Sequence, residues 1–325
     1  MNIQIAGTGR HLPEDVLTNA DLEKMVATSN QWIVERTGIH ERRIAGKGVC
    51  ASDLAAPAAQ QALAAAGIKP EEVDLIIVGT STPDMYFPST ACFVQAKIGA
   101  VNAVAFDVLA ACSGFIYGLS MAENFLKGGK FKTALVIGAE VYSSIINWED
   151  RTTCVLFGDG AGAVVLRAGE GTPGILSTHI FSDGTKAGDL YTPGGGSVNR
   201  FTPELVTMKK YALTMKGNST FKVAVKSMAD AARIALEKNG VSASDLKMVV
   251  PHQANQRIIS AVAKQLGLDE SLFYSNLERY GNTAAASIPI ALDEVVREGK
   301  AVKGDLILMV TFGGGFTWGS ALIRL

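Results

Sequence analysis

Cys112 is the residue whose type and position first suggest covalent chemistry. It lies in "DVLAACSGFIYG" (107–118), between an extended apolar run and a segment of small and aromatic residues that predicts a helix. A free cysteine is commonly a small hydrophobic packing residue. At the N-terminus of a helix, however, backbone N–H groups and the helix dipole favour a thiolate. The position therefore leaves two interpretations open, a structural thiol or a nucleophile.

A cysteine nucleophile needs a partner for its thiolate and a donor for developing negative charge, and His252 and Asn282 are the candidates. His252 follows "LKMVVP", which predicts a strand, and active residues of open α/β sheets gather at the carboxyl ends of strands. Asn282 lies in "ERYGNTAAASIP", just before a segment of small residues. Taken alone, His252 could be a histidine satisfied at a strand end, and Asn282 a turn or N-cap residue.

The glycine run in "TFGGGFTWG" (311–319) is the third candidate feature. Alone it could be only a tight turn between strands. Near a nucleophile, such a run can instead expose a backbone N–H to an oxyanion. Each signal is weak alone, but their convergence favours a Cys-His-Asn site.

Other catalytic or metal-binding motifs are missing from the sequence. The "GTG" at 7–9 lacks dinucleotide-fingerprint spacing, and neither a P-loop nor a G-x-S-x-G elbow occurs. The cysteines form no C-x-x-C pair and the histidines are scattered, so we expect no zinc site. These residues are Cys50, Cys92, Cys112 and Cys154, and His11, His40, His179 and His252.

Composition limits the class of protein. The chain has 325 residues, 48% of them hydrophobic and 19% charged, with a formal net charge of -1. Near-zero charge argues against nucleic acid or a membrane surface as the main partner. The start, "MNIQIAGTGRHLP", does not resemble a signal peptide, and no apolar run is long enough to span a membrane. We therefore expect a cytoplasmic enzyme with reduced thiols.

The elements that would position these residues occur twice in the chain. Gly67 and Gly240 lie 173 positions apart, and each ends a predicted helix before a short acidic turn and an apolar strand. The same separation carries 132–138 ("KTALVIG") onto 305–311 ("DLILMVT"), and Cys112 onto Ala285. Repetition at one offset predicts two similar halves.

The halves meet near "RAGEGTPGI" (167–175), and we place them at residues 1–172 and 173–325. Each alternates strands with long amphipathic helices such as 219–238, which predicts βαβ units on mixed sheets. The helix "SGFIYGLSMAENFL" after Cys112 is apolar nearly all round, as expected for a helix enclosed between two sheets.

Four stretches together resemble the β-ketoacyl-acyl-carrier-protein synthase III family, the initiating condensing enzymes of type II fatty acid synthesis. They are "ACSGFIYG", "PHQANQRI", "YGNTAAASIP" and "FGGGFTWGSAL", and "NQWIVERTGIHERR" and "FGDGAGAVVL" extend the likeness over the whole chain. The resemblance implies an α/β thiolase fold, with duplicated halves in a five-layered αβαβα sandwich, and a cytoplasmic homodimer.

The resemblance also implies site residues. Cys112, His252 and Asn282 would form the catalytic triad, and the N–H groups of Cys112 and Gly314 the oxyanion hole. Phe87 would reach across the dimer to close the partner's acyl pocket, and Leu156, Phe157 and Phe312 would set pocket depth. The coenzyme A site would comprise Trp32, Arg36, Thr37, Arg151, Asn218, Phe221, Ala254 and Asn255. Thr152 stands where the family often has glycine, which puts the loop geometry at Arg151 in doubt.

The implied reaction has two halves. Cys112 would take an acyl group from acyl-CoA, by default acetyl-CoA, and malonyl-acyl-carrier protein would then lose CO2 and attack the acyl-enzyme. Decarboxylation drives the condensation, so we expect no cofactor and no metal; the coenzyme A thioester is a substrate. A basic face bearing Lys222, Lys226, Arg257 and Lys264 is the predicted docking site for an acidic carrier protein, although such charges are usually only a solvated face.

Several alternatives remain at this stage. A thiolase would need a second cysteine near the chain end, which "TFGGGFTWGSAL" lacks, and a hydroxymethylglutaryl-CoA synthase would need a glutamate base, for which Glu140 is a candidate. The nearest rival is a related enzyme that primes a polyketide or other acyl pathway. A non-catalytic binding partner on the same fold is opposed by the intact Cys112, His252 and Asn282.

Overall fold

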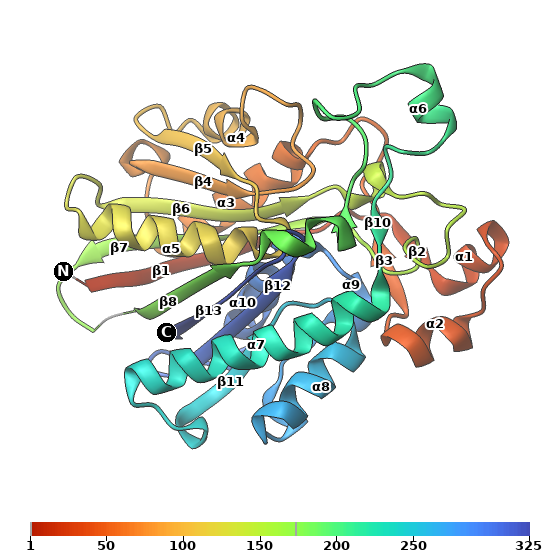
Figure 1. Ribbon diagram of the computed structural model, residues 1–325. Helices are drawn as coiled ribbons and strands as arrows, with labels where there is room; N and C mark the ends of the chain where they lie inside the picture. Colours follow the sequence, from red (N-terminus) through yellow and green to blue (C-terminus); the bar gives the residue numbers. More distant parts are fainter. Residues whose placement is uncertain (1, 173) are drawn as a thin grey trace.

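Two β-sheets organise the computed structural model, which describes residues 2–172 and 174–325 (Figure 1). The first sheet has the order β1 (Asn2–His11), β7 (Gly160–Gly169), β6 (Thr133–Glu140), β4 (Leu75–Gly79) and β5 (Val104–Val108). The second has the order β11 (Leu246–Pro251), β12 (Leu306–Gly313), β13 (Thr317–Arg324) and β8 (Ile175–Ser182). Strands β4, β5 and β6 are parallel, as are β11 and β12, while the remaining pairs in these sheets are antiparallel.

Helices separate and cover the sheets. The central pair, α5 (Gly114–Lys127) and α10 (Ser287–Arg297), shares one hydrophobic core with strands of both sheets. On the outer face of the first sheet lie α3 (Ala51–Ala66) and α4 (Thr90–Ile98), and on that of the second lie α7 (Gly217–Asn239) and α8 (Gln256–Leu266). The expected five-layered αβαβα arrangement is confirmed (Figure 1).

The two sheets repeat one topology. The order β1-β7-β6-β4 corresponds to β8-β13-β12-β11, and Gly67 and Gly240 end α3 and α7 with φ values of 63° and 61°. The 3-10 turns that begin the central helices, η2 (Ala111–Ser113) and η7 (Ala284–Ala286), have the predicted separation. In the second sheet, the position beside β11 that corresponds to β5 is occupied by an isolated bridge between Val249 and Phe273. The boundary at 172/173 stays a prediction, since residue 173 lies outside the described residues.

The predicted enclosure of the helix after Cys112 is only partly correct. Every residue of α10 from Ser287 to Val295 is buried, but Phe125 in α5 is 41% exposed. Helix α5 packs mainly against β6, β4 and β8 and also contacts β5, and both β5 and β8 are edge strands. The flank of α5 that faces past these edges therefore has no covering layer.

Smaller elements gather at the end of the molecule where β4, β6, β11 and β12 terminate (Figure 1). Strands β2 (Val16–Thr18) and β3 (Glu41–Arg43) pair there, as do β9 (Leu190–Tyr191) and β10 (Thr214–Met215). The short helices are α1 (Asn19–Met25), α2 (Asn30–Thr37), α6 (Pro203–Thr207) and α9 (Leu277–Tyr280). The other 3-10 turns are η1 (Pro70–Glu72), η3 (Tyr142–Ile145), η4 (Gly184–Asp189), η5 (Ala243–Asp245) and η6 (Glu270–Leu272).

Across the described ranges, no helix combines the length and apolar character needed to cross a membrane.

Candidate active site

Cys112 lies in η2, immediately before α5, and is 7% exposed. The preceding residue, Ala111, has a φ of 47°, a left-handed conformation that turns the chain sharply between β5 and α5. Close approach of β4 also requires glycine at position 79, because a Cβ there would lie 2.5 Å from the carbonyl carbon of Gly114. The predicted position at the N-terminal end of a central helix is thus confirmed.

Cys112 and His252 are both uncharged near pH 7, whereas the helix-end position alone would favour a Cys112 thiolate. Burial, together with the nearby Glu140 carboxyl, raises the pKa of the Cys112 thiol to about 12. Burial lowers the pKa of His252 to about 3, so its imidazole is neutral near pH 7. Cys112 is therefore a thiol near pH 7, because burial outweighs the stabilisation expected from the helix end. A reaction at Cys112 Sγ would have to remove this proton.

The second half of the chain delivers His252 from the end of β11. Its backbone N–H donates to the Val310 carbonyl at 2.8 Å, and its Nδ1 lies 2.7 Å from Ser287 Oγ. The backbone N–H of Gln253 donates to the same Ser287 oxygen at 3.3 Å. The Ser287 hydroxyl can donate to His252 Nδ1 while its oxygen accepts from Gln253 N–H. The neutral imidazole then carries its proton on Nε2. His252 Nε2 is then a hydrogen-bond donor.

Asn282 is fixed by backbone and side-chain contacts. Its N–H donates to the Leu156 carbonyl at 2.8 Å, and its carbonyl accepts from Gly158 N–H at 3.1 Å. Its side-chain Oδ1 accepts from Ala284 N–H at 2.9 Å. The residue thus makes the local turn contact that its sequence suggested, and this contact leaves its Nδ2 amide as the donating end.

The glycine run packs directly against the segment that carries Cys112. A Cβ on Gly313 would lie 2.7 Å from the backbone nitrogen of Cys112, so only glycine allows this approach. Thr311 Oγ1 donates to the Cys112 carbonyl at 3.1 Å, and Thr317 Oγ1 donates to the Ala110 carbonyl at 2.8 Å. These contacts tie the β12–β13 turn to η2 and place Gly314 beside Ala111.

A cavity of about 830 Å³ connects these groups with the surface near α7 and α8. Cys112, His252, Asn282 and Gly314 all line it, so four residues from separate parts of the sequence meet at one cavity. Other predicted residues in its wall are Leu156, Phe157, Asn218, Phe221, Lys222, Ala254, Asn255, Arg257 and Phe312.

Comparison with known proteins decides the family. A profile described as 3-oxoacyl-[acyl-carrier-protein] synthase III matches residues 106–184, and its C-terminal counterpart matches residues 236–325. The chain is 54% identical over 320 residues to a β-ketoacyl-[acyl-carrier-protein] synthase III of Caldanaerobacter subterraneus subsp. tengcongensis, covering 98% of this chain and 97% of that one. A Xanthomonas campestris relative of the same name is 54% identical over 321 residues, covering 99% and 98%. The chain belongs to the β-ketoacyl-[acyl-carrier-protein] synthase III family.

Solved structures agree with this assignment. The synthase III from Aquifex aeolicus has a TM-score of 0.93 at 50% identity and covers 99% of this chain and 100% of its own. A priming β-ketosynthase of the R1128 polyketide pathway also has a TM-score of 0.93, at 34% identity, covering 100% and 96%. The thiolase fold expected for the synthase III family is thereby confirmed.

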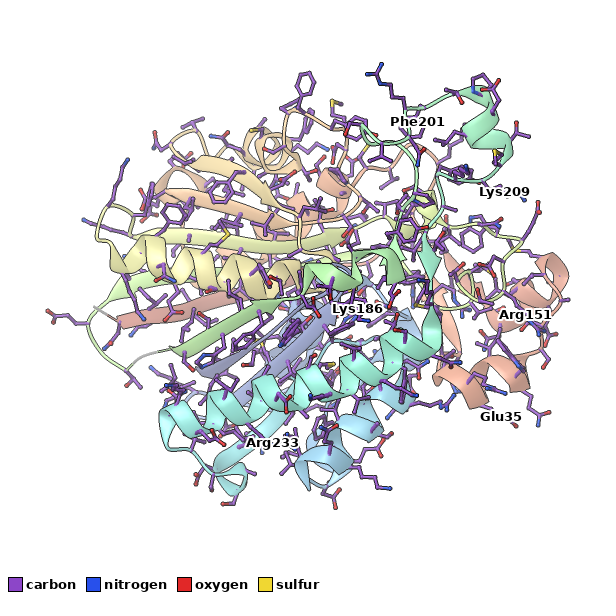
Figure 2. The ribbon with its side chains drawn as sticks, in the orientation of Figure 1. Glu35, Arg151, Lys186, Phe201, Lys209 and Arg233 are labelled. Carbon is purple, nitrogen blue, oxygen red and sulfur yellow. The ribbon has the colours of Figure 1, made fainter. Side chains whose placement is uncertain are left out.

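In this synthase III chain, two arginines approach the ring of Trp32. The guanidinium carbon of Arg151 is 5.0 Å from the centroid of the Trp32 ring, and that of Arg36 is 6.0 Å away. Figure 2 shows Arg151 on the same side of the molecule as α1 and α2. Asn255 Nδ2 donates to the Arg36 carbonyl at 3.1 Å and so joins α2 to the start of α8.

Five residues predicted for coenzyme A or acyl binding do not line the cavity: Trp32, Arg36 and Arg151, described above, and Thr37 and Phe87. Thr37 is buried and lies outside the cavity wall; its hydroxyl donates to the Ile33 carbonyl at 2.6 Å and accepts from Ile39 N–H at 3.0 Å. Its hydroxyl therefore caps the end of α2. Phe87 is 83% exposed and does not line the cavity of its own chain.

The predicted basic residues divide into two groups. Lys222 and Arg257 line the mouth of the cavity, and the Arg257 guanidinium carbon lies 5.9 Å from the centroid of Phe221. Lys226 and Lys264 are exposed on α7 and α8 but do not line the cavity. Only the first group is positioned to meet a substrate that enters the synthase III site.

Sequence reasoning missed three residues of this synthase III site. Ser287 contacts His252 but lies 35 positions away in sequence, and the small-residue segment around it gave no chemical signal. Tyr142 lines the cavity, and its ring stacks on Phe157 with centroids 4.8 Å apart. Leu190, from the β9 strand, also lines the wall. Within the residues that the structure describes, no cluster of three or more His, Cys, Asp or Glu could hold a metal ion.

Proposed function

We propose that this synthase condenses an acyl-CoA primer with malonyl-acyl-carrier protein to give 3-oxoacyl-acyl-carrier protein, coenzyme A and CO2. One observation carries the proposal: a buried thiol, two side-chain N–H donors and a glycine turn line one cavity. Nucleophilic attack on a thioester needs the first, and stabilisation of oxyanions needs the others.

In the first half-reaction, Cys112 Sγ attacks the thioester carbonyl of the acyl-CoA. The N–H groups of Cys112 and Gly314 hold the developing oxyanion. The bond between the carbonyl carbon and the coenzyme A sulfur then breaks, and the thiol proton of Cys112 leaves with the released coenzyme A thiol. An acyl-Cys112 thioester remains in a buried cavity, which limits hydrolysis.

In the second half-reaction, malonyl-acyl-carrier protein loses CO2 and leaves a thioester enolate. The enolate oxygen accepts hydrogen bonds from His252 Nε2 and Asn282 Nδ2, the two donors defined by Ser287 and Ala284. The enolate carbon attacks acyl-Cys112, the carbon–sulfur bond breaks, and the Cys112 thiolate regains a proton from solvent. Loss of CO2 drives the reaction, so the proposal includes no metal or redox cofactor.

We place the coenzyme A nucleotide at Trp32, where Arg36 and Arg151 can pair with phosphates while the indole stacks on adenine. We place the acyl chain in the cavity part lined by Leu156, Phe157 and Phe312, with acetyl as the default primer. A cytoplasmic location belongs to the same proposal, because coenzyme A thioesters are used there. A related role in priming a polyketide pathway is the second candidate, favoured by the R1128 neighbour at 34% identity.

The decisive experiment is intact-mass analysis after incubation with acyl-CoAs of increasing chain length. The wild-type chain should gain the mass of one acyl group, and Cys112→Ser should gain none, because an alkoxide is far harder to form than a thiolate. The longest acyl group accepted measures the depth of the pocket. If the wild type gains no acyl mass, or if Cys112→Ser acylates and condenses at a near-native rate, Cys112 is not the nucleophile.

A further inference from the structure

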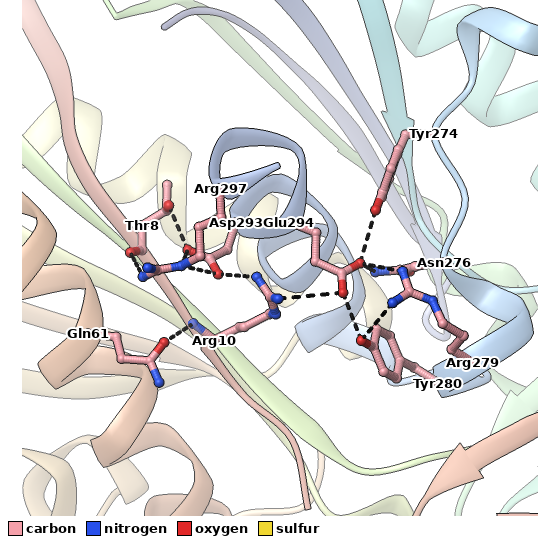
Figure 3. A network of polar contacts seen from close by, with 10 residues as sticks. All are labelled: Thr8, Arg10, Gln61, Tyr274, Asn276, Arg279, Tyr280, Asp293, Glu294 and Arg297. Carbon is pink, nitrogen blue, oxygen red and sulfur yellow. Dashed lines mark hydrogen bonds and ion pairs between the residues drawn. The ribbon is translucent and has the colours of Figure 1, made fainter. Parts of the chain in front are cut away.

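A buried polar network lies behind the active site, on α10 (Figure 3). Asp293 and Glu294 are adjacent in sequence and both are fully buried, yet their carboxylates point to different parts of the chain. Arg10 bridges them, with Nη1 2.6 Å from Asp293 and Nη2 3.8 Å from Glu294. Buried carboxylates need compensating donors, so the identity of each donor shows what each carboxylate holds in place.

Glu294 collects its donors from one short segment, residues 274–280. Its Oε2 accepts from Asn276 Nδ2 at 2.8 Å, from Tyr274 Oη at 3.0 Å and from Arg279 Nη2 at 3.1 Å. Its Oε1 accepts from Tyr280 Oη at 2.7 Å. One carboxylate thus fixes four side chains of the segment that ends two residues before Asn282.

The same segment is joined to His252 through its neighbour Gln253. Gln253 Oε1 accepts from the Asn276 backbone N–H at 3.1 Å, and its Nε2 donates to the Tyr274 carbonyl at 3.2 Å. Gln253 Nε2 also donates to the Pro251 carbonyl at 2.8 Å. The segments that carry His252 and Asn282 are therefore both held by Glu294, and the segment of His252 is held through Asn276.

Asp293 holds a different region. Its oxygens accept from Thr8 Oγ1 at 2.7 Å, from Arg10 on β1, and from Arg297 Nε at 2.8 and 2.9 Å. None of these partners belongs to segment 274–280 or to a cavity-lining segment. Asp293 therefore ties α10 to β1, whereas Glu294 ties α10 to the active-site loop.

We propose that Glu294 is a positioning residue for Asn282 and, through Asn276 and Gln253, for His252. It touches no substrate; it holds the backbone from which the two donors project. Cys112 and Gly314 lie on segments that Glu294 does not contact, so the carboxylate acts on decarboxylation and condensation and not on acylation. This inference rests on the proposed function for its two half-reactions.

The test compares Glu294→Gln with the matched variant Asp293→Asn, since each removes one buried charge from the same helix. Three quantities are measured: acyl mass gained from acyl-CoA, labelled CO2 released from malonyl-carrier protein, and the thermal unfolding midpoint. Glu294→Gln should slow CO2 release by about tenfold while acylation stays within about twofold, because a small displacement of a donor is costly to the transition state. Asp293→Asn should lower the unfolding midpoint without separating the two half-reactions.

A second pair keeps the test decisive if Glu294→Gln does not fold. Tyr280→Phe deletes one hydroxyl donor to Glu294, and Thr8→Val deletes one hydroxyl donor to Asp293. Slower CO2 release with normal acylation in Tyr280→Phe, but not in Thr8→Val, supports the proposal. Equal loss in both half-reactions, or the same selective loss in the Asp293-side variants, overturns it. A wild-type chain that performs neither half-reaction contradicts the proposed function instead.

Discussion

Each of the three chemical residues is held by a nearby group, which is distant in sequence for His252 and Cys112 and two residues away for Asn282. Ser287 sets the ring of His252, the Ala284 N–H sets the amide of Asn282, and the glycine turn lies against Cys112. The two N–H donors are thereby aimed without any charged partner, and they suit an enolate oxygen better than they suit proton abstraction from the thiol.

Replacing these donors should separate the half-reactions. His252→Ala and Asn282→Ala should each slow decarboxylation by roughly 10²–10³-fold, the usual cost of losing an oxyanion donor. Acylation should remain measurable, because the Cys112 and Gly314 N–H groups serve it. Labelled CO2 release, measured separately from acyl transfer, checks this. Equal losses in both steps would show that the roles are wrongly divided.

Glu140 provides a prediction with a defined pH dependence. Burial raises the pKa of this carboxyl to about 8, and its charge raises the pKa of the Cys112 thiol. The charge is absent well below pH 8, so Glu140→Gln should alkylate at Cys112 like the wild type at pH 6.5. Above pH 8 the wild-type carboxylate disfavours the thiolate, and the variant should react about threefold faster at pH 9.

The measurement is the rate of iodoacetamide labelling of the Cys112 peptide by mass spectrometry. The Cys92 peptide from the same digest serves as the internal control. Identical wild-type and variant rates at pH 9 would remove Glu140 as an influence on the nucleophile.

At the scale of elements, α7 and α8 form one side of the cavity mouth. Both end in glycines with positive φ, Gly240 and Gly267, and α8 begins at an Asn255 cap whose amide also holds α2. Their facing surfaces bring Lys222 and Arg257 to the entrance from positions far apart in sequence. Because the whole chain has a net charge of -1, this basic entrance is a local feature. A local basic surface is what docking of an acidic carrier protein would require.

Lys222→Glu or Arg257→Glu should raise KM for malonyl-carrier protein by about tenfold while leaving acylation by acyl-CoA nearly intact. Added salt should weaken the wild-type interaction, because it screens surface charges. Lys303→Glu is the matched control, since Lys303 is exposed just before β12, at the end of the sheet opposite the site. Carrier kinetics that are indifferent to both reversals and to salt would place docking elsewhere.

At the scale of the whole molecule, one edge leaves large apolar side chains in water. They include Val104 on edge strand β5, Leu109 between β5 and Cys112, and Phe87, the last two 80% and 83% exposed. Phe201, in the loop that leads into α6, is also exposed (Figure 2). Such a grouping is typical of a protein interface, and we propose the homodimer here, with Phe87 meeting the partner's cavity.

Val104→Glu should weaken dimerisation by about tenfold or more, because it buries an unpaired charge in the proposed interface. Sedimentation over a range of concentrations measures the dimer fraction. Val302→Glu is the control, since Val302 is 59% exposed but lies in the loop before β12, away from β5. A monomeric wild type, or equal effects of both variants, would contradict the interface.

The sequence by itself determined the features that local pattern encodes. Gly67, Gly240 and the strand at 305–311 revealed the duplication because helix ends and buried strands have local signatures. Cys112, His252 and Asn282 could be brought together because the duplication predicts which strand ends and helix starts face one another. The structure confirmed that they line one cavity.

Only the tertiary structure decided what depends on burial and on contacts distant in sequence. Ser287 as the partner of His252, and Glu294 as the acceptor for residues 274–280, follow from the packing of α10 between the sheets. The pKa of Cys112 is raised mainly by desolvation, which no local sequence pattern reports. The hydroxyl of Thr37 donates to the Ile33 carbonyl at the end of its own helix. The physical reason is the same in each case: a side chain's chemistry is fixed by the groups that replace water around it, and those groups come from elsewhere in the chain.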